Sequence, residues 1–112
     1  MLPIHRRVGK TLISEVIKQG YTVYSKNLTI KYQPIKGESL FGFVVPIKVS
    51  KKAVDRNLLK RRARHIIRRH LSRLKKNHTY VIMFKIGSLG ASFKELEIEL
   101  LALFKKVNLI ND

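Results

Sequence analysis

The sequence predicts a single-domain α+β protein in which helices pack over one sheet. A long stretch at residues 51–76 has helical periodicity, and apolar segments with strand character precede and follow it. Shorter helical segments lie near both ends, so the expected order is helix, strands, helix, strand, helix. With 112 residues, of which 45% are hydrophobic, the chain can bury one core and is predicted to form one domain over residues 1–112.

The first predicted elements are a basic arm and a short helix. We expect residues 1–8 to form an extended basic arm, because Pro3 opposes helix there. Residues 10–19 predict a helix that ends before Gly20, since glycine commonly follows the last turn of a helix. The apolar stripe of this helix consists of Leu12, Ile13, Val16 and Ile17.

Strands are expected between this helix and the long one. Residues 21–33 are rich in Tyr, Thr, Val and Ile, and apolar and polar residues alternate from position 28, which predicts one buried face. Residues 34–39 contain Pro, Gly and Ser and predict the turn of a hairpin. Residues 40–45 are nearly all apolar and predict a central strand, although Pro46 either ends that strand or marks it as an edge strand.

Residues 51–76 predict one long amphipathic helix. They contain no Pro or Gly, and they carry half of the 24 Lys and Arg residues of the chain against a single acid, Asp55. Ser50 or Asp55 is expected to cap the first turn or to complement its dipole. At about 100° per residue, the predicted core arc consists of Leu59, Ala63, Ile66, Ile67, His70 and Leu74. The opposite side consists of Asn57, Arg61, Arg64, His65, Arg68 and Lys75.

The chain closes with a strand and a helix. Residues 79–86 predict a further apolar strand after a break at residues 77–78. Ser92 followed by Glu95 matches a capping box, which begins a helix that extends to Val107. Residues 108–112 are expected to form a short tail. Core spacing in this last helix selects Phe93, Leu96, Leu100, Leu103, Phe104 and Val107.

The charge balance indicates an anionic partner. The formal net charge is +17, from 24 basic and 7 acidic residues. An ordinary solvated helix mixes both signs, because like charges at i,i+4 are destabilising. A helix on which most exposed neighbours repel one another is typical of a protein that binds a polyanion, and such binding should depend strongly on salt. The alternative is a solvated surface without a partner.

Composition argues against several other classes of protein. The absence of cysteine excludes disulfides and thiolate metal sites. No apolar run reaches the ~20 residues of a membrane span, and the first residues lack the apolar core of a signal peptide. We therefore expect a cytoplasmic protein without a membrane partner.

The residues themselves predict neither a catalytic nor a metal site. Glu95 and Glu99 share a helix face, but basic residues lie nearby, and we interpret this face as solvated. The histidines lack HxxxH and HExxH spacing, and His65 and His70 point apart on the predicted helix, where His70 should be packed or hydrogen-bonded. The glycines are scattered, so no phosphate-binding loop is expected. The chain is predicted to be a binder with no catalytic residue.

Both RNA and DNA are possible partners of the basic helix. Such a helix could enter a DNA major groove, but no second helix precedes it at a short turn. Alternation of strands and helices is more common among RNA-binding α+β modules, which favours RNA. A ribosomal or other structural RNA-binding protein, a DNA-binding architectural protein and a metal-dependent nuclease remain as alternatives, the last disfavoured because no acid cluster could hold the metal.

One motif narrows this choice. Residues 56–64, RNLLKRRAR, contain every fixed position of R-N-x-x-K-R-x-x-R, and they resemble the RNR signature of the bacterial ribonuclease P protein subunit. Residues Gly42, Val45, Lys48 and Ala53 also fit, and the resemblance covers roughly residues 9–107.

The sequence departs from the family pattern in two places. Residues 46–48 are Pro-Ile-Lys where the family usually has Ser-Lys-Lys, so one basic contact is missing, for which Lys51 and Lys52 could compensate. Ile13 and Ile17 stand where the first helix of the family usually carries aromatic residues, so apolar contact would replace stacking on bases.

The resemblance implies a fold and a function. The family fold is an αβββαβα sandwich, ribosomal protein S5 domain 2-like, with a left-handed βαβ crossover around the long helix, against the usual right-handed rule. The implied function is that of the protein subunit of a ribonucleoprotein endonuclease that removes the 5′ leader from precursor tRNA. In this family the RNA performs the hydrolysis with Mg²⁺ that the RNA itself binds, and one protein is expected per RNA.

The resemblance also assigns residues to two surfaces. A cleft between the first helix and the sheet is expected to contact the leader, with Ile13, Ile17, Thr29 and Lys31 in it, although exposed strand faces are normally polar anyway. Asn57 could read a sugar or base edge or hold the start of the helix. The residues expected to bind the catalytic RNA are Lys48, Lys51, Lys52, Arg56, Asn57, Lys60, Arg61, Arg64 and Arg68.

Overall fold

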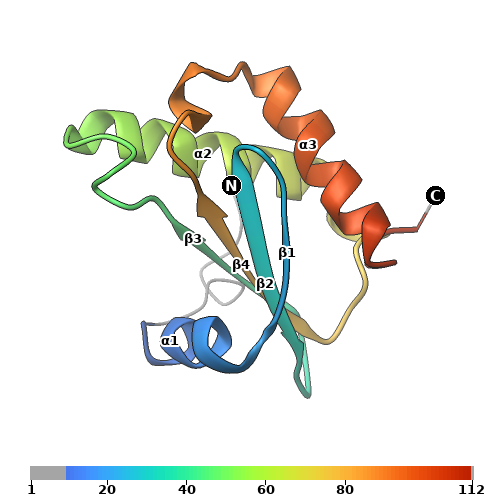
Figure 1. Cartoon of the computed structure of the whole chain (residues 1–112). Coiled ribbons are helices and arrows are strands. Elements are labelled where there is room, and N and C mark those ends of the chain that lie inside the picture. The colour runs from blue at the N-terminus through green and yellow to red at the C-terminus, as the bar shows by residue number, and fades with distance from the viewer. Residues whose placement is uncertain (1–9, 112) are drawn as a thin grey trace.

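The fold is built around one four-stranded sheet with helices on both faces (Figure 1). The computed structural model describes residues 10–111, so the basic arm predicted at residues 1–8 lies outside the described residues. Among the helices described, none is both long enough and apolar enough to cross a membrane. The elements in chain order are α1 (Lys10–Gln19), β1 (Tyr21–Tyr24), β2 (Leu28–Pro34), β3 (Leu40–Val44), α2 (Ala53–His70), the 3-10 turn η2 (Leu71–Arg73), β4 (His78–Phe84), the 3-10 turn η3 (Ser88–Gly90) and α3 (Phe93–Lys106).

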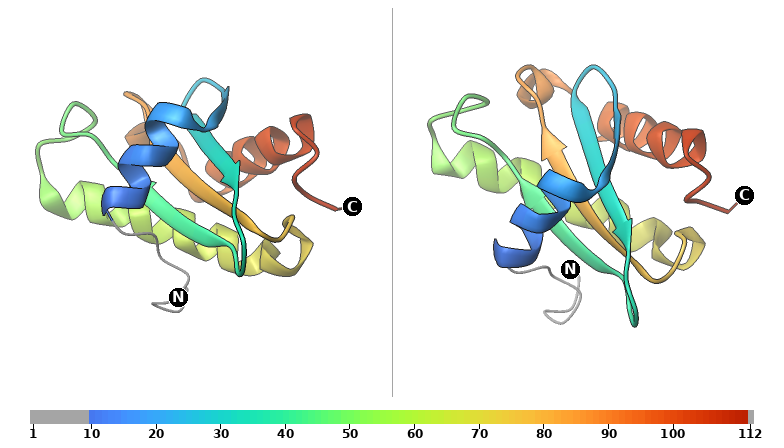
Figure 2. Two further views of the ribbon diagram at one scale, coloured as in Figure 1. Left: turned by 90° about the horizontal axis from the view of Figure 1, so that it is seen from below. Right: turned by 60° about the horizontal axis from the view of Figure 1, so that its bottom comes forward.

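The helices divide between the two faces of the sheet. Helix α1 lies against one face, whereas α2 and α3 cover the other (Figure 2). The element order is αβββαβα, which confirms the mixed α+β fold expected from the sequence. The handedness of the β3–α2–β4 connection stays a prediction from the family resemblance.

The strands do not lie in the sheet in the order of the sequence. The order is β1-β2-β4-β3, with β4 antiparallel to β2 and parallel to β3. The hairpin predicted between β2 and β3 is therefore wrong, because β4 lies between them. The central position predicted for β3 is also wrong, whereas the alternative indicated by Pro46, an edge strand, is confirmed. The hairpin is instead formed by β1 and β2, since the stretch predicted as one strand at residues 21–33 turns at residues 25–27.

The core lies between the sheet and the pair α2 and α3. The predicted apolar stripe of α2 is buried at Leu59, Ala63, Ile66 and Ile67, and α3 buries Leu96, Leu100, Leu103 and Phe104. The ring of Tyr80 on β4 stacks on Phe41 of β3, with a centroid distance of 5.2 Å, and meets the ring of Phe104 edge-on at 5.6 Å. Burial raises the pKa of the Tyr80 phenol, which keeps it protonated as a donor to the carbonyl oxygen of Lys75.

Helix α2 is shorter than predicted at both ends. It begins at Ala53 and ends at His70, and η2 then leads into a loop towards β4. Leu74 is buried as predicted, but in this loop, where it forms a β-bridge with Ile110. The predicted tail is packed as far as it is described: the N–H of Lys75 donates to the carbonyl of Leu109 at 2.8 Å, and Leu109 belongs to the core.

Two acids of α3, Glu95 and Glu99, make structural hydrogen bonds. The capping box is confirmed: the N–H of Glu95 donates to Oγ of Ser92 at 3.1 Å, and the N–H of Ser92 donates to Oε1 of Glu95 at 2.9 Å. These bonds with Ser92 lower the pKa of the Glu95 carboxyl. The solvated interpretation of Glu99 is wrong, because its carboxylate accepts the backbone N–H of Asn27 at 2.9 Å and the hydroxyl of Ser25. Glu99 thus joins α3 to the β1–β2 turn.

Gly20 follows α1 as predicted, but the reason is close packing. Its N–H donates to the carbonyl of Val16 at 2.8 Å. A Cβ at this position would lie 2.6 Å from the carbonyl oxygen of Val16 and 2.9 Å from that of Tyr32. Both atoms belong to backbone that other contacts fix, so a side chain would force α1 away from β2.

We expect Gly20→Ala to lower the free energy of unfolding by about 1–3 kcal/mol, the usual cost of overpacking. Gly90→Ala is the matched control, because nothing lies within 4 Å of the Cβ that it would add. Urea unfolding of both variants measures the difference. Equal stability of the two variants would show that α1 does not pack as closely as described.

Candidate nucleic-acid interface

The buried stripe of α2 determines which of its basic residues face outward. Because Leu59, Ala63, Ile66 and Ile67 are buried, the opposite side of the helix is open to solvent. Arg61 and Arg68 are exposed there. They are seven residues apart, a spacing that repeats within about 20° on an α-helix, so both lie on one face. We call this side of α2, with Asn57, Lys60, Arg61, Arg64 and Arg68, the outward face.

The loop before α2 is held by Ser50. Its hydroxyl donates to Oδ2 of Asp55 at 2.9 Å, and its Oγ accepts the N–H of Lys52 at 3.2 Å. Lys52 itself is the N-cap residue and makes no side-chain cap, so Ser50 satisfies a backbone donor from outside the helix. Nη1 of Arg56 donates to the carbonyl of Ser50 at 2.9 Å. Arg56, predicted to bind RNA, therefore also has a structural role.

Other predicted residues at this end are open to solvent. Lys48, Lys51 and Lys52 are exposed in the loop between β3 and α2, and Asn57 is exposed in the second turn of the helix. The three lysines precede α2 directly in the sequence, so they lie at the start of the helix that carries the outward face.

Arg64 is positioned by an aromatic ring. Its guanidinium carbon lies 5.5 Å from the centre of the Phe43 ring, and the residue is half-buried. Cation–π contact of this kind restrains a guanidinium while leaving its edge able to donate hydrogen bonds. No pattern in the sequence indicated this contact, because Phe43 belongs to a strand that becomes the neighbour of α2 only in the folded protein.

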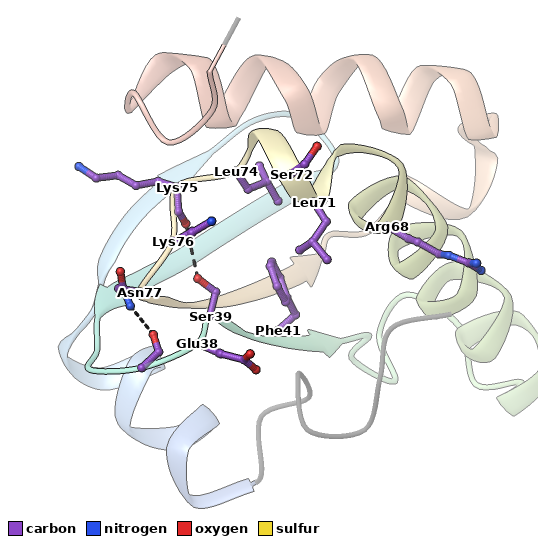
Figure 3. A pocket seen from close by; sticks show the side chains of 11 residues that line it. Glu38, Ser39, Phe41, Arg68, Leu71, Ser72, Leu74, Lys75, Lys76 and Asn77 are labelled. Atoms are coloured by element: carbon purple, nitrogen blue, oxygen red, sulfur yellow. Dashed lines mark hydrogen bonds between the residues drawn. The ribbon is translucent and has the colours of Figure 1, made fainter.

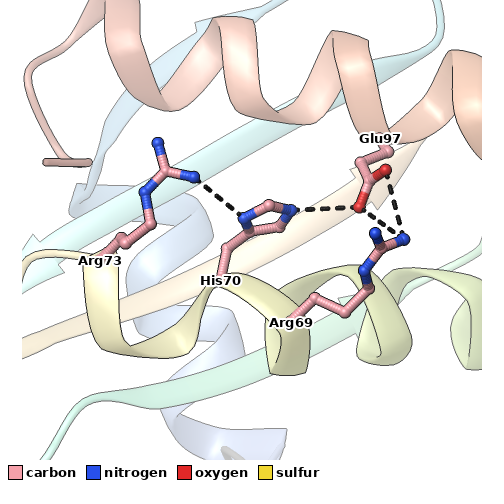
Figure 4. Close-up of polar contacts among 4 residues, drawn as sticks. All are labelled: Arg69, His70, Arg73 and Glu97. Atoms are coloured by element: carbon pink, nitrogen blue, oxygen red, sulfur yellow. Dashed lines mark hydrogen bonds and ion pairs between the residues drawn. The ribbon is translucent and has the colours of Figure 1, made fainter. Parts of the chain in front are cut away.

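The basic residues on the α3 side of α2 are engaged within the protein. Oε2 of Glu97 lies 3.1 Å from Nη1 of Arg69 and 3.1 Å from Nε2 of His70 (Figure 4). Nδ1 of His70 is in turn 3.3 Å from Nη1 of Arg73. Nη1 of Arg62 donates to the carbonyl of Ala91 at 3.2 Å. The prediction of a packed or hydrogen-bonded His70 is confirmed.

The outward face keeps its charge. Within residues 10–111, neither Arg61 nor Arg68 forms an ion pair, whereas the acid nearest in sequence, Asp55, is bonded to Ser50. Glu95, Glu97 and Glu99 are all used within or around α3. The sequence predicted the capping role of Glu95, but it could not show the partners of Glu97 and Glu99, which lie on distant segments.

The described acids do not form a metal site. No group of three or more His, Asp or Glu side chains that could hold an ion occurs among residues 10–111. The hydrogen bonds described above also occupy the carboxylates of Asp55, Glu95, Glu97 and Glu99. Mg²⁺ is bound through carboxylate, phosphate and water oxygens in octahedral geometry, and the described residues gather no cluster of carboxylates that would supply such ligands.

The residues predicted for a leader cleft lie on the other face of the sheet. Thr29 and Lys31 alternate with the buried Leu28 and Ile30, so they point to the face that α1 covers. Nζ of Lys31 donates to Oγ1 of Thr22 on β1 at 2.9 Å. Ile13 and Ile17 of α1 are half-buried. The two predicted surfaces are therefore separated by the thickness of the sheet.

Comparisons with known proteins identify the family. The model of the family described as Ribonuclease P matches residues 4–108. The chain belongs to the ribonuclease P family. A ribonuclease P protein component from Microcystis aeruginosa is 31% identical over 113 residues, which cover 96% of this chain and 94% of that protein. Another, from Finegoldia magna, is 33% identical over 93 residues, with 83% of this chain and 81% of that protein covered.

Solved structures of ribonuclease P proteins share the fold. The protein from Staphylococcus aureus superposes with a TM-score of 0.86 at 18% identity, covering 95% of this chain and 98% of that one. The protein from Thermotoga maritima gives a TM-score of 0.76 at 25% identity, with 94% of each chain covered. Membership in the ribonuclease P family implies an RNA partner and a role in tRNA processing as the protein component of an endoribonuclease.

We expect Arg56 and Arg61 to differ in their effect on stability. Arg56→Ala should lower the free energy of unfolding by about 1 kcal/mol, because it removes a hydrogen bond to the loop before α2. Arg61→Ala should change it by no more than about 0.5 kcal/mol, as is usual for an exposed side chain. Denaturant unfolding without RNA measures both values. An equal decrease in the two variants would contradict the structural role of Arg56.

Proposed function

We propose that this chain is the protein subunit of the ribonuclease P ribonucleoprotein and binds its catalytic RNA through the outward face of α2. The observation that supports this most strongly is the exposed pair Arg61 and Arg68, which no acid in residues 10–111 neutralises. Planar guanidinium groups suit the bidentate recognition of phosphate. The basic loop residues Lys48, Lys51 and Lys52 extend this surface beyond the helix.

The proposal includes contact with the 5′ leader of precursor tRNA on the α1 side of the sheet. Ile13 and Ile17 would offer apolar contact to unpaired bases, and Thr29 and Lys31 would offer hydrogen bonds and charge to the sugar-phosphate backbone. Single-stranded RNA is commonly held by such a combination of apolar contact with bases and positive charge. Because this surface is on the opposite face from α2, one protein could hold the catalytic RNA and the leader at the same time.

The chemistry of cleavage is assigned to the RNA. The hydrolysis would use Mg²⁺ held mainly by phosphate oxygens of the RNA, because four of the described carboxylates, those of Asp55, Glu95, Glu97 and Glu99, are used in structural bonds. The contribution of the chain would be to orient the RNA and the leader and to neutralise phosphate charge where they approach. Neutralisation by the protein should lower the Mg²⁺ concentration that the RNA needs.

A ribosomal or other structural RNA-binding role, without a part in cleavage, is the alternative that the same basic surface would support. It predicts that the chain co-sediments with ribosomes and has no effect on precursor tRNA. The presence of two surfaces on opposite faces of the sheet favours the ribonuclease P role. A purely structural protein would not need the second surface, on the α1 side, in addition to the outward face of α2.

We expect Lys60→Ala with Arg61→Ala to weaken binding to the catalytic RNA from the same genome. The slope of log affinity against log salt should fall by about one for each phosphate that the variant no longer neutralises. Lys26→Ala with Lys94→Ala is the matched control: it removes the same charge from exposed positions outside the proposed surfaces. Filter binding between low and moderate salt measures the slopes. Equal slopes for the two double variants would place the RNA elsewhere.

We expect the isolated chain to leave precursor tRNA intact, whereas the chain added to the catalytic RNA should restore leader removal at low Mg²⁺. The reason is that, under this proposal, the protein supplies positive charge and orientation, whereas the RNA holds the Mg²⁺ that activates water. Cleavage assays over a Mg²⁺ series, with the RNA alone and the protein alone as controls, measure this. Leader removal by the protein alone would overturn the assignment of chemistry to the RNA.

A further inference from the structure

A pocket lies at the far end of α2, away from the RNR segment (Figure 3). Its volume is about 690 Å³. One wall comes from the start of β3 around residues 37–41, and the other comes from the end of α2, from η2 and from the loop at residues 74–77. The pocket is within the 300–1,000 Å³ range typical of small-ligand sites, so its size suits about one nucleotide.

The floor of the pocket is apolar and rigid. Phe41 is 1% exposed and its ring is stacked on Tyr80, so it cannot move without disturbing the core. Leu71 and Leu74 lie beside it (Figure 3). Asn77 is fixed at the opposite wall, because its Nδ2 donates to the carbonyl of Gly37. Leu71 is half-buried, whereas Phe41 and Leu74 are 1% and 3% exposed, so a base would contact Leu71 above a floor that the core holds in place.

Three cations and one acid, Glu38, line the pocket. Arg68, Lys75 and Lys76 are exposed, and in Figure 3 the charged ends of Arg68 and Lys75 lie on opposite sides of the pocket. A nucleic-acid strand that crosses the opening would meet a cation on either side. Arg68 also belongs to the outward face, so this pocket adjoins the surface proposed to bind RNA.

We propose that this pocket receives one unpaired nucleotide of the RNA that lies along α2. The base would enter over Phe41, Leu71 and Leu74, and its neighbouring phosphates would contact Arg68 on one side and Lys75 or Lys76 on the other. The nucleotide must be unpaired, because a base within an A-form helix cannot present its face to a protein. This inference rests on the proposed binding of RNA by α2, and it adds a site where the protein reads the shape of a bulge or loop.

The first test uses the isolated full-length chain and nuclear magnetic resonance. Adding 5′-mononucleotides should shift the backbone amide signals of Leu71 and Asn77, and inorganic phosphate at equal concentration should shift them much less. Leu71→Trp should abolish the shifts by filling the pocket, and its unfolding temperature checks that it still folds. Lys75→Ala with Lys76→Ala keeps the walls intact and should weaken mononucleotide binding several-fold. Pocket amides that do not respond to mononucleotides, or respond equally to phosphate, would overturn the proposal.

The second test measures affinity for the catalytic RNA. If the nucleotide no longer occupies the pocket, RNA binding should weaken by roughly tenfold, which corresponds to about 1.4 kcal/mol. Lys75→Ala with Lys76→Ala should show this effect, and Lys26→Ala with Lys94→Ala is again the control with equal charge. If the pocket variant matches this control while Lys60→Ala with Arg61→Ala binds weakly, the pocket proposal fails and the proposed function stands. Mononucleotide binding without any effect on RNA affinity would indicate a free nucleotide as the ligand and would also contradict the proposal.

Discussion

The burial of one stripe of α2 against the sheet and α3 is the constraint on which the other features depend. Leu59, Ala63, Ile66 and Ile67 are each at most 3% exposed, and together they fix the rotation of the helix about its axis. Full burial of an aliphatic side chain is worth about 1.5–3 kcal/mol, far more than the repulsion between neighbouring exposed cations. Burial of the apolar stripe can therefore keep a row of like charges on the outward face, although these charges repel one another.

The distribution of acids complements this arrangement. The chain has only seven acidic residues, and four of those described have structural partners: Asp55 with Ser50, Glu95 with Ser92, Glu97 with His70 and Glu99 with Asn27. Glu97 compensates the positive charge on the α3 side of α2 and leaves Arg61 and Arg68 on the outward face uncompensated within residues 10–111. The protein thus concentrates its charge on one side, which favours a polyanion that approaches from that side.

Much of the fold followed from local patterns in the sequence. Periodicity identified α2 and its buried stripe, and the capping box located the start of α3. The features that were predicted wrongly are those that depend on residues far apart in the sequence. The insertion of β4 between β2 and β3 was not visible because both β3 and β4 are short apolar segments, and either could be central. The contact between Glu99 and Asn27 joins residues 72 positions apart, which no local pattern encodes. The RNR segment pointed to the outward face, but the contact of Arg64 with Phe43 needed the folded structure.

The pocket at the end of α2 also depends on tertiary structure. Its walls come from residues that are separated in sequence by a whole helix, and its basic rim looked like a mere continuation of the predicted helix. In the structure the helix ends at His70, so that Lys75 and Lys76 leave the helical array and border a cavity. An early end of the helix therefore converts part of a charged helix surface into a shaped site.

Directed cleavage of the RNA from single cysteines would show whether the outward face of α2 holds it, because the chain has no cysteine of its own. Val54 on α2 and Ile98 on α3 are both exposed, at 68% and 61%, so Val54→Cys and Ile98→Cys can each carry a tethered hydroxyl-radical source at little cost to the fold. Val54 is seven residues before Arg61 and lies on the outward face. We expect strong, localised scission of the catalytic RNA from position 54 and little from position 98. Scission that is equal from both positions, or stronger from position 98, would contradict binding through α2.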